Sequence, residues 1–211
     1  MNGFMEMKYG YYINNKSDYY SMTNINKKIT IIRNNYSKII ANENIKKGEI
    51  ILVEKPIYQE IDVIKLLYEI LKNKEDINII YLYPRCYLEL PNNKYLSNLI
   101  KLINNYDNHK IKKYLLLINI NTLYFYYSKI LFNAFQMNNY STILPIGAMM
   151  NHSCKPNIMF YEKNNMMIFE ALTNINKNEE LFYSYLRNFK YTNNKEKQLY
   201  LLNHYNFICE C

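Results

Sequence analysis

The alternation of apolar and polar residues divides the chain into strand-rich ends and a helical middle. Between Ile29 and Ile57, short apolar runs such as "ITII" and "EIILVE" are separated by turn residues, which predicts short strands. Apolar residues then recur at helical spacing over 61–72, 92–107 and 111–137. In the first of these helices, the spacing places five side chains on one face: Ile61, Ile64, Leu67, Tyr68 and Leu71.

Strand patterns return after the helical block. The segment "IMFYEKNNMMIFE" predicts a hairpin that turns at Asn164 and Asn165, because asparagine tolerates the positive φ of tight turns. Residues 195–205 have the pattern of a short amphipathic helix. The pattern as a whole predicts an α+β fold.

Two short segments of the chain resemble each other. Residues 41–51 and 171–181 share an alanine, an Asn-Ile pair, a lysine and a glutamate at the same spacing. Gly48 and Asn178 occupy the same place in the two segments, and both residue types accept a left-handed backbone. We expect two similar strand–turn–strand corners in one β-rich fold.

Composition sets broad limits on function. The chain has 211 residues, of which 49% are hydrophobic, so it can bury a substantial core in one or two domains. Asn, Lys, Ile and Tyr are abundant, as in proteins of AT-rich genomes, so single Asn and Lys residues carry little information. The net charge of +8 suits an acidic partner. A basic nucleic-acid-binding protein is therefore one hypothesis, and it predicts strongly salt-dependent binding. Because the lysine bias alone is enough to produce such a charge without an acidic partner, nucleic acid is not expected as the primary ligand.

The N-terminus and the cysteines indicate a reducing compartment. The start "MNGFMEMKYG" lacks the apolar core of a signal peptide, which favours an intracellular protein of the nucleus or cytoplasm. Disulfides are then not expected, and metal binding or reactive thiols become the better interpretations. The apolar stretch 114–137 contains several polar residues, so we expect a buried helix and no membrane span. The four cysteines are Cys86, Cys154, Cys209 and Cys211.

The segment "GAMMNHSCKPNIMF" (147–160) concentrates polar residues between apolar flanks. His152 and Cys154 have a spacing found in zinc sites, but the ligand pattern is incomplete. A hydrolase is disfavoured, because His152 and Ser153 are sequence neighbours that seldom face each other, and no Gly-x-Ser-x-Gly is present. A cofactor-binding loop is the third interpretation.

The third interpretation is supported by a family resemblance. The motifs "NHSCKPN" and "NEELFYSY" resemble the two C-terminal motifs of SET-domain lysine methyltransferases, and "YNFICEC" resembles their post-SET segment. Upstream, "ANENIKKGEIILVEKP" resembles the N-terminal half of the SET domain, and "LFNAF" resembles the segment before the Asn-His motif. The SMYD-like branch, with SET and MYND domains, is the most similar in these motifs. The resemblance covers residues 30–57 and 129–211.

The resemblance implies a fold and a domain organisation. The fold would be a SET fold of several small β-sheets with a C-terminal pseudoknot and a helical insertion. The implied segments are an N-terminal extension (1–28), the SET N-terminal half (29–57), the helical insertion (58–132), the SET C-terminal half (133–188) and a post-SET segment (189–211) that is expected to be truncated.

The resemblance also implies an activity and a site. The family transfers a methyl group from S-adenosylmethionine to the lysine ε-amine of a protein, so the partner would be a protein substrate, with a histone tail as one candidate, and the role would be that of a chromatin regulator. The catalytic residue would be Tyr185, with Tyr183 lining the lysine channel. Cofactor-binding residues would be Asn151, His152, Asn133, Ala148, Met150, Phe207 and Tyr185.

A structural zinc site is implied in the same way. In SMYD-like enzymes the motif cysteine joins cysteines of the post-SET segment, which here gives Cys154, Cys209 and Cys211, with the fourth ligand outside this chain. Cys86 has no cysteine near it in the sequence and is expected to be a buried thiol.

The sequence departs from the family pattern in three places, and the first of them favours a second hypothesis. The Gly-x-Gly that usually precedes the first corner is replaced, with Tyr36 and Lys38 at the two glycine positions. The MYND finger is missing, and Asn178 stands at an expected glycine, which the corner can accept. The alternative is a catalytically weak or inactive SET module that acts as a protein-binding scaffold. Intact Tyr185 argues for the enzyme.

Overall fold

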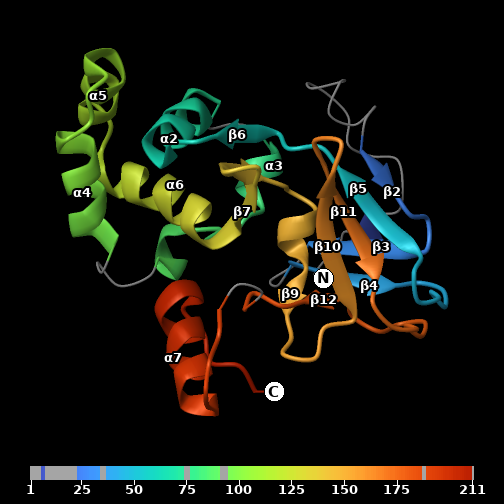
Figure 1. The fold of residues 1–211 in the computed structure, drawn as a ribbon. Coiled ribbons are helices and arrows are strands. Elements are labelled where there is room, and N and C mark those ends of the chain that lie inside the picture. Colours follow the sequence, from blue (N-terminus) through green and yellow to red (C-terminus); the bar gives the residue numbers. More distant parts are fainter. Residues whose placement is uncertain are drawn as a thin grey trace, which may run out of the picture. The chain divides into compact units, whose positions relative to one another are not determined.

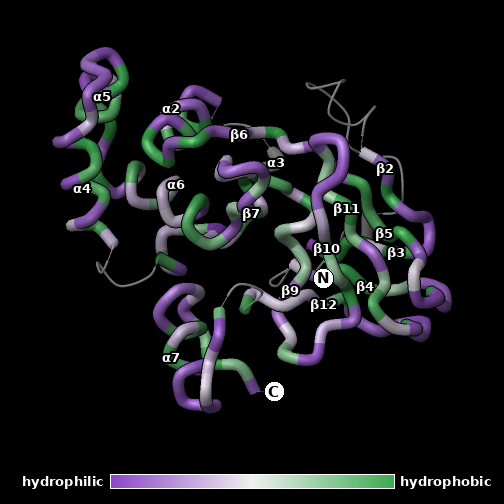
Figure 2. Tube along the Cα trace, viewed as in Figure 1, coloured by the Kyte–Doolittle hydropathy of each residue, from purple (hydrophilic) through white to green (hydrophobic). Residues whose placement is uncertain are grey.

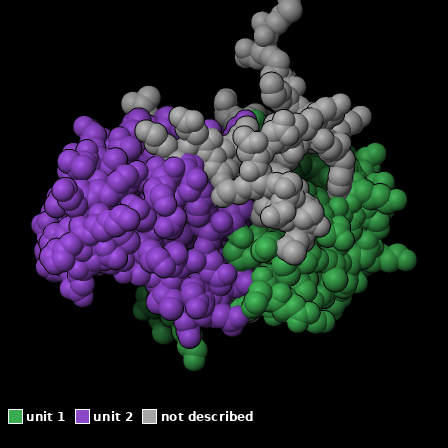
Figure 3. Space-filling view, turned by 90° about the horizontal axis from the view of Figure 1, so that it is seen from above, with its two compact units in different colours: residues 1–56, 146–211 green, residues 57–145 purple. Residues whose placement is uncertain are grey.

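The computed structural model describes residues 6–7, 23–33, 37–73, 77–90, 95–186 and 189–210 (Figure 1). The chain divides into two compact units, which Figure 3 distinguishes by colour. Unit 1 consists of residues 1–56 and 146–211, and unit 2 consists of residues 57–145. The chain therefore leaves unit 1 after its first strands and returns to it for the C-terminal motifs. Tyr36, Cys211 and most of the predicted N-terminal extension lie outside the described residues.

Unit 1 is built from small sheets. In the first sheet the strand order is β1-β3-β4, in the second it is β10-β11-β5-β2, and β9 and β12 form a parallel pair. Figure 2 shows hydrophobic residues concentrated along β5 and β11. The strands are β1 (Glu6–Met7), β2 (Asn24–Ile25), β3 (Ile29–Arg33), β4 (Ser37–Ala41), β5 (Ile50–Glu54), β9 (Asn151–His152), β10 (Ile158–Lys163), β11 (Met166–Ala171) and β12 (Phe182–Tyr183).

The predicted hairpin is confirmed. Strands β10 and β11 pair antiparallel, with Lys163 opposite Met166. Asn164 and Asn165 form the turn with φ of 53° and 58°, the left-handed pair that two-residue hairpins require. The predicted C-terminal helix is α7 (Asn194–Tyr205), which Asn193 caps by accepting a hydrogen bond from Glu196 N.

The two similar sequence segments pair with each other in a nearly symmetric way. Ile45 N donates to Ile175 O, and Ile175 N donates to Ile45 O, both at 2.9 Å. Gly48 N donates to Ala171 O, and its counterpart Asn178 N donates to Ala41 O. Both residues have the expected positive φ, 85° for Gly48 and 70° for Asn178. A further reciprocal pair joins the corners at 2.9 Å: Lys47 N donates to Asn174 Oδ1, and Lys177 N donates to Asn44 Oδ1.

Unit 2 contains helices and one antiparallel sheet of order β6-β8-β7. Lys129 is buried in its core, where Nζ donates to Leu82 O at 2.6 Å and Pro84 O at 2.5 Å. The elements are β6 (Tyr58–Glu60), α2 (Val63–Lys72), α3 (Ile77–Ile80), the 3₁₀ helix η1 (Tyr87–Glu89), α4 (Leu96–Asn104), α5 (His109–Leu116), α6 (Ile120–Asn133), β7 (Ala134–Met137) and β8 (Tyr140–Ile143).

No single helix among the described residues has the length and apolar character to cross a membrane, whereas α5 and α6, bent by 118° with respect to each other, have them together as a pair.

The helical prediction for 111–137 is wrong in two places. The chain breaks between α5 and α6, where Asn119 accepts a hydrogen bond from Asn121 N and begins a new helix. Residues 134–137 form strand β7, because Asn138 and Asn139 at φ of 45° and 65° turn the chain into a hairpin with β8.

Two further predictions are corrected. Ile61 does not share the buried face of its helix: it precedes the N-cap Asp62 and is 69% exposed. Asp62 accepts hydrogen bonds from Ile64 N and Lys65 N, so the helix begins after Ile61. Cys86 is exposed rather than buried. It precedes η1, at the surface of unit 2.

Candidate functional site

The site forms in unit 1, where the two C-terminal motifs lie side by side. The parallel pairing of β9 and β12 places Asn151 opposite Phe182 and His152 opposite Tyr183. Asn157 links the two segments with its side chain, because Nδ2 donates to Glu180 O and Oδ1 accepts from Phe182 N, both at 2.8 Å. This crossing of distant segments holds each motif in place through the other.

Asn151 is oriented by two acceptors. Its Nδ2 donates to Glu180 Oε1 at 2.7 Å and to Ser37 O at 3.2 Å. A carboxylate acceptor makes the first bond the stronger one. The side chain of Asn151 thus joins the first motif to the second and to β4.

His152 is neutral and has a defined tautomer. Its Nδ1 accepts a hydrogen bond from Tyr185 N at 3.0 Å, so the ring proton lies on Nε2. Nε2 lies 3.4 Å from Cys154 Sγ and can donate to it. Burial lowers the pKa of His152 to about 4, and the charge of Lys197 adds to this effect. The imidazole therefore brings no positive charge to the site at neutral pH.

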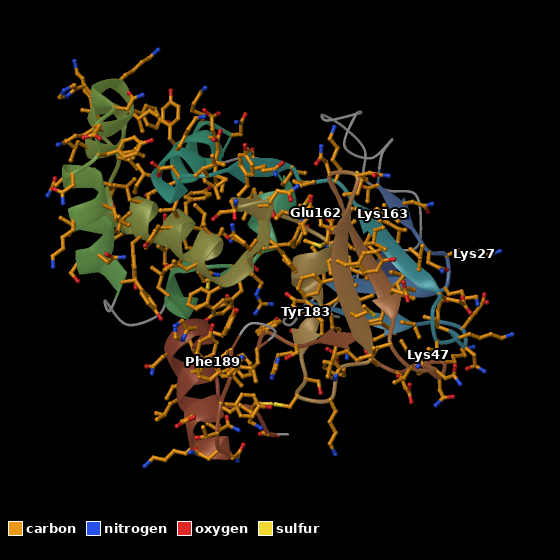
Figure 4. All side chains as sticks on the ribbon, in the orientation of Figure 1. Lys27, Lys47, Glu162, Lys163, Tyr183 and Phe189 are labelled. Carbon is orange, nitrogen blue, oxygen red and sulfur yellow. The ribbon has the colours of Figure 1, made fainter. Side chains whose placement is uncertain are left out.

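Tyr185 donates its hydroxyl hydrogen to Met150 O at 3.1 Å. Its ring centroid lies 5.0 Å from that of Tyr183 and 4.7 Å from that of Tyr205. Burial raises the pKa of Tyr185 and of Tyr183 well above the usual value for tyrosine. Both phenols therefore stay protonated at physiological pH. Figure 4 labels Tyr183 beside β9 and β12.

The segment after α7 closes over this aromatic cluster. The ring of Phe207 lies 5.9 Å from the His152 ring and 6.2 Å from the Tyr185 ring, between centroids. Asn206, with φ of 60°, ends α7 and turns the chain towards Phe207. Tyr183, Tyr185, His152 and Phe207, which the sequence analysis selected separately, are thus brought together in one cluster.

Cys154 and Cys209 form a possible metal site beside the cluster. Their sulfur atoms are 3.7 Å apart. Two thiolates on a tetrahedral zinc ion, with Zn–S bonds of about 2.3 Å, are about 3.8 Å apart, so the spacing fits zinc. Lys197 is nearly buried here, and its hydrogen bond with Cys154 raises the pKa of Lys197.

His152 completes a group of three ligand atoms within 4.8 Å of one another. With Nδ1 accepting from Tyr185 N, however, Nε2 carries the proton and has no lone pair for a metal. The thiols therefore fit zinc better than the imidazole does. The predicted third ligand, Cys211, lies outside the described residues.

The remaining predicted cofactor residues fall in both units. Ala148 lies in η3 (Gly147–Met149), the 3₁₀ turn that leads into β9, and Met150 follows it. Asn133 belongs to unit 2, where its Nδ2 donates to Tyr83 O at 2.5 Å and to Lys129 O at 2.8 Å. Its role towards a cofactor stays a prediction.

Two residues of the site were not predicted from the sequence. Tyr205 packs against Tyr185, but no pattern distinguishes it among 24 tyrosines. Glu54 is a fully buried carboxylate at the end of β5. Its signal was present, because strand alternation places Glu54 on the same face as Leu52, in an apolar run.

Comparison with known families agrees with this arrangement. Residues 37–186 match the model of the SET domain. The chain belongs to the SET domain family. A SET domain-containing protein of Acanthamoeba polyphaga mimivirus is 33% identical over 161 residues, which are 71% of this chain and 59% of that protein. The chain thus spans about three fifths of the length of this viral relative.

Solved SET structures resemble the fold. The SET domain of LSMT bound to MeLysine and AdoHcy has a TM-score of 0.52 and 14% identity, over 91% of this chain and 55% of that chain. Rubisco LSMT bound to AdoMet has a TM-score of 0.50 and 15% identity, over 87% of this chain and 52% of that chain. The predicted α+β SET fold of several small sheets is therefore confirmed.

Proposed function

We propose that this SET-domain chain is an S-adenosylmethionine-dependent protein-lysine N-methyltransferase. The observation that carries the proposal is the Tyr185 hydroxyl, which is fixed on Met150 O beside a neutral His152 and between aromatic rings. The two similar LSMT structures, one bound to AdoMet and the other to MeLysine and AdoHcy, support the same chemistry.

The aromatic residues would prepare the lysine. A free lysine has a pKa near about 10.4, and only its neutral amine is nucleophilic. The rings of Tyr183, Tyr185 and Tyr205 pack together and would form a wall that excludes water, and desolvation lowers the pKa of an amine held against such a wall. Tyr185 donates its hydrogen to Met150 O and accepts a hydrogen bond from the Tyr183 hydroxyl, so one lone pair of its oxygen would be left to accept an N–H of the amine. That hydrogen bond would orient the nitrogen lone pair.

The cofactor would be held by the first motif. S-adenosylmethionine, when bound, supplies a methyl group on a positively charged sulfur. Asn151 and His152 would hold it, together with the backbone of Ala148 and Met150. The residues fit this group, because the neutral imidazole adds no like charge and aromatic faces such as that of Phe207 attract cations.

Zinc is part of the same proposal. Cys154 and Cys209 would bind it, with Cys211 and a fourth ligand completing the tetrahedron. Zinc would tie the first motif to the segment after α7, and so keep Phe207 against the site.

Substrate, branch and compartment are also proposed. The substrate would be a lysine of a protein, and histone tails are one class of candidate. The role would then be that of a chromatin regulator. The compartment would be the nucleus or the cytoplasm. Motif similarity favours the SMYD-like branch. Lys38, at a usual glycine position, supports the alternative of an inactive scaffold, because its half-buried side chain in β4 occupies space that glycine leaves open.

Calorimetric titration with S-adenosylmethionine tests the proposal. We expect the wild type to bind, Asn151→Ala to bind at least about tenfold more weakly, and Tyr185→Phe to bind within about twofold of wild type. Tyr161→Phe is a matched control, because its hydroxyl bonds Glu170 on the sheet. Absence of binding at millimolar cofactor by the folded wild-type protein would refute the enzyme and leave the scaffold.

A further inference from the structure

Glu54 holds two consecutive backbone amides with one carboxylate. Its Oε1 accepts from Ile146 N at 2.7 Å, and its Oε2 accepts from Gly147 N at 2.8 Å. The side chain is fully buried, and hydrogen bonds to an ionised acceptor are roughly twice as strong as neutral ones. The start of the turn that precedes β9 is therefore anchored to the end of β5.

The turn fits closely against this anchor. A Cβ atom on Gly147 would lie 2.3 Å from Phe169 Cζ and 3.1 Å from Glu54 Oε2. Phe169 belongs to β11, which pairs with β5 and places Met167 opposite Glu54. Two neighbouring strands thus form the surface on which the backbone of Gly147 rests, and only glycine fits there.

The same short turn ends at the acceptor of the Tyr185 hydroxyl. Gly147 O accepts from Met150 N at 3.1 Å, and Met150 O accepts from Tyr185 Oη at 3.1 Å. Glu54 and Tyr185 therefore hold opposite ends of one segment. A shift of this segment at Gly147 would move both the Met150 carbonyl and the backbone around Ala148.

We infer that Glu54 is a positioning residue for methyl transfer: its carboxylate fixes the turn from Ile146 to Met150, and through Met150 O it fixes the Tyr185 hydroxyl. The inference rests on the proposed function, because it assumes that this turn helps to hold the cofactor and the lysine amine. A purely structural Glu54 would stabilise unit 1 without affecting cofactor affinity.

The first measurement needs no cofactor. The chain contains four glycines, so labelling with ¹⁵N-glycine gives an amide spectrum in which Gly147 is readily assigned. In Glu54→Gln we expect the Gly147 amide proton to shift upfield and to exchange about tenfold faster or more, because a neutral amide replaces the carboxylate. Glu170→Gln is the matched control, since it removes a carboxylate from the same sheet and leaves the turn untouched. An unchanged Gly147 resonance in Glu54→Gln would overturn the inference.

The second measurement separates positioning from stability. Ile51→Val, a buried change in the same strand, lowers stability on the face of β5 opposite to Glu54. We expect Glu54→Gln to weaken S-adenosylmethionine binding about tenfold, and Ile51→Val and Glu170→Gln to bind as the wild type does, all well below their melting temperatures. Wild-type affinity in Glu54→Gln, with a shifted Gly147 resonance, would show a structural role only. If the wild type itself does not bind, the proposed function fails and the positioning role with it, while the Gly147 amide still reports whether the contact exists.

Discussion

Asparagine carries the sharp turns of this chain. Among the described residues, every non-glycine residue with positive φ is an asparagine. Its side chain tolerates the left-handed region better than those of other non-glycine residues. The compositional bias had suggested that single asparagines carry little information, yet their placement marks the turns. They are Asn138, Asn139, Asn164, Asn165, Asn178 and Asn206.

Asn178→Ala should lower the free energy of unfolding by about 1 kcal/mol, because alanine is strained at φ of 70°. Asn178→Gly should leave stability within about 0.5 kcal/mol of wild type. Urea unfolding measures both. Gly48→Asn tests the counterpart position, where a Cβ meets no atom within 4 Å, and should be equally well tolerated. Equal stability of the alanine and glycine variants at 178 would contradict this account.

The site residues that lie within a contiguous sequence motif could be predicted from the sequence. Asn151, His152 and Tyr185 lie in two contiguous patterns, and the structure places those patterns side by side. Glu54 was not predicted as a site residue, because its partners Ile146 and Gly147 lie 92 and 93 residues further along the chain. Because Glu54 binds backbone amides, the residue types at positions 146 and 147 do not reveal this contact in the sequence.

Helix α6 shows what periodicity can and cannot predict. The apolar pattern correctly predicted a helix, but it continued through 134–137, where burial alternates and the chain is a strand. A segment of four residues at the end of a helix is too short to distinguish helical spacing from strand alternation. The turn at Asn138 and Asn139 makes residues 134–137 a strand. The break before α6 depends on a cap, Asn119, that an asparagine-rich chain does not make conspicuous.

The buried Lys129 of α6 should make the free energy of unfolding depend on pH. Burial lowers the pKa of Lys129 to about 7, below the value near 10.5 of an exposed lysine. Between these values the unfolded chain binds one more proton than the folded chain, so stability rises with pH. From pH 7 to pH 9 the wild type should gain about 2 kcal/mol relative to Lys129→Met. Urea unfolding of both proteins at pH 7, 8 and 9 measures this difference, and a constant difference would mean that the ammonium stays charged in the fold.

For the whole molecule, the zinc proposal makes a quantitative prediction. Cys154 and Cys209 are 55 residues apart in the sequence, so a shared ion would tie the first motif to the segment after α7. The purified protein should contain about one zinc ion per chain, and Cys154→Ser should lose it, with a fall in Tm on the order of 5 °C. Elemental analysis and thermal unfolding measure the two effects.

Cys86→Ser provides the control for that experiment, because Cys86 is an exposed thiol in unit 2. It should keep both zinc and Tm. Zinc content at the wild-type level in Cys154→Ser would exclude Cys154 as a ligand and remove the support for a zinc site at this position.

The reciprocal pairing of the two corners has a consequence for synthesis on the ribosome. The pairing joins Lys47 to Asn174, and these two residues are 127 positions apart in the sequence. Translation at about 5–20 residues per second separates their emergence by on the order of ten seconds. During that interval the first strands of unit 1 lack the partners that their edge amides and carbonyls bond in the finished protein. Nascent chains of this protein should therefore be clients of chaperones that shield unpaired strand edges, until the second corner leaves the exit tunnel.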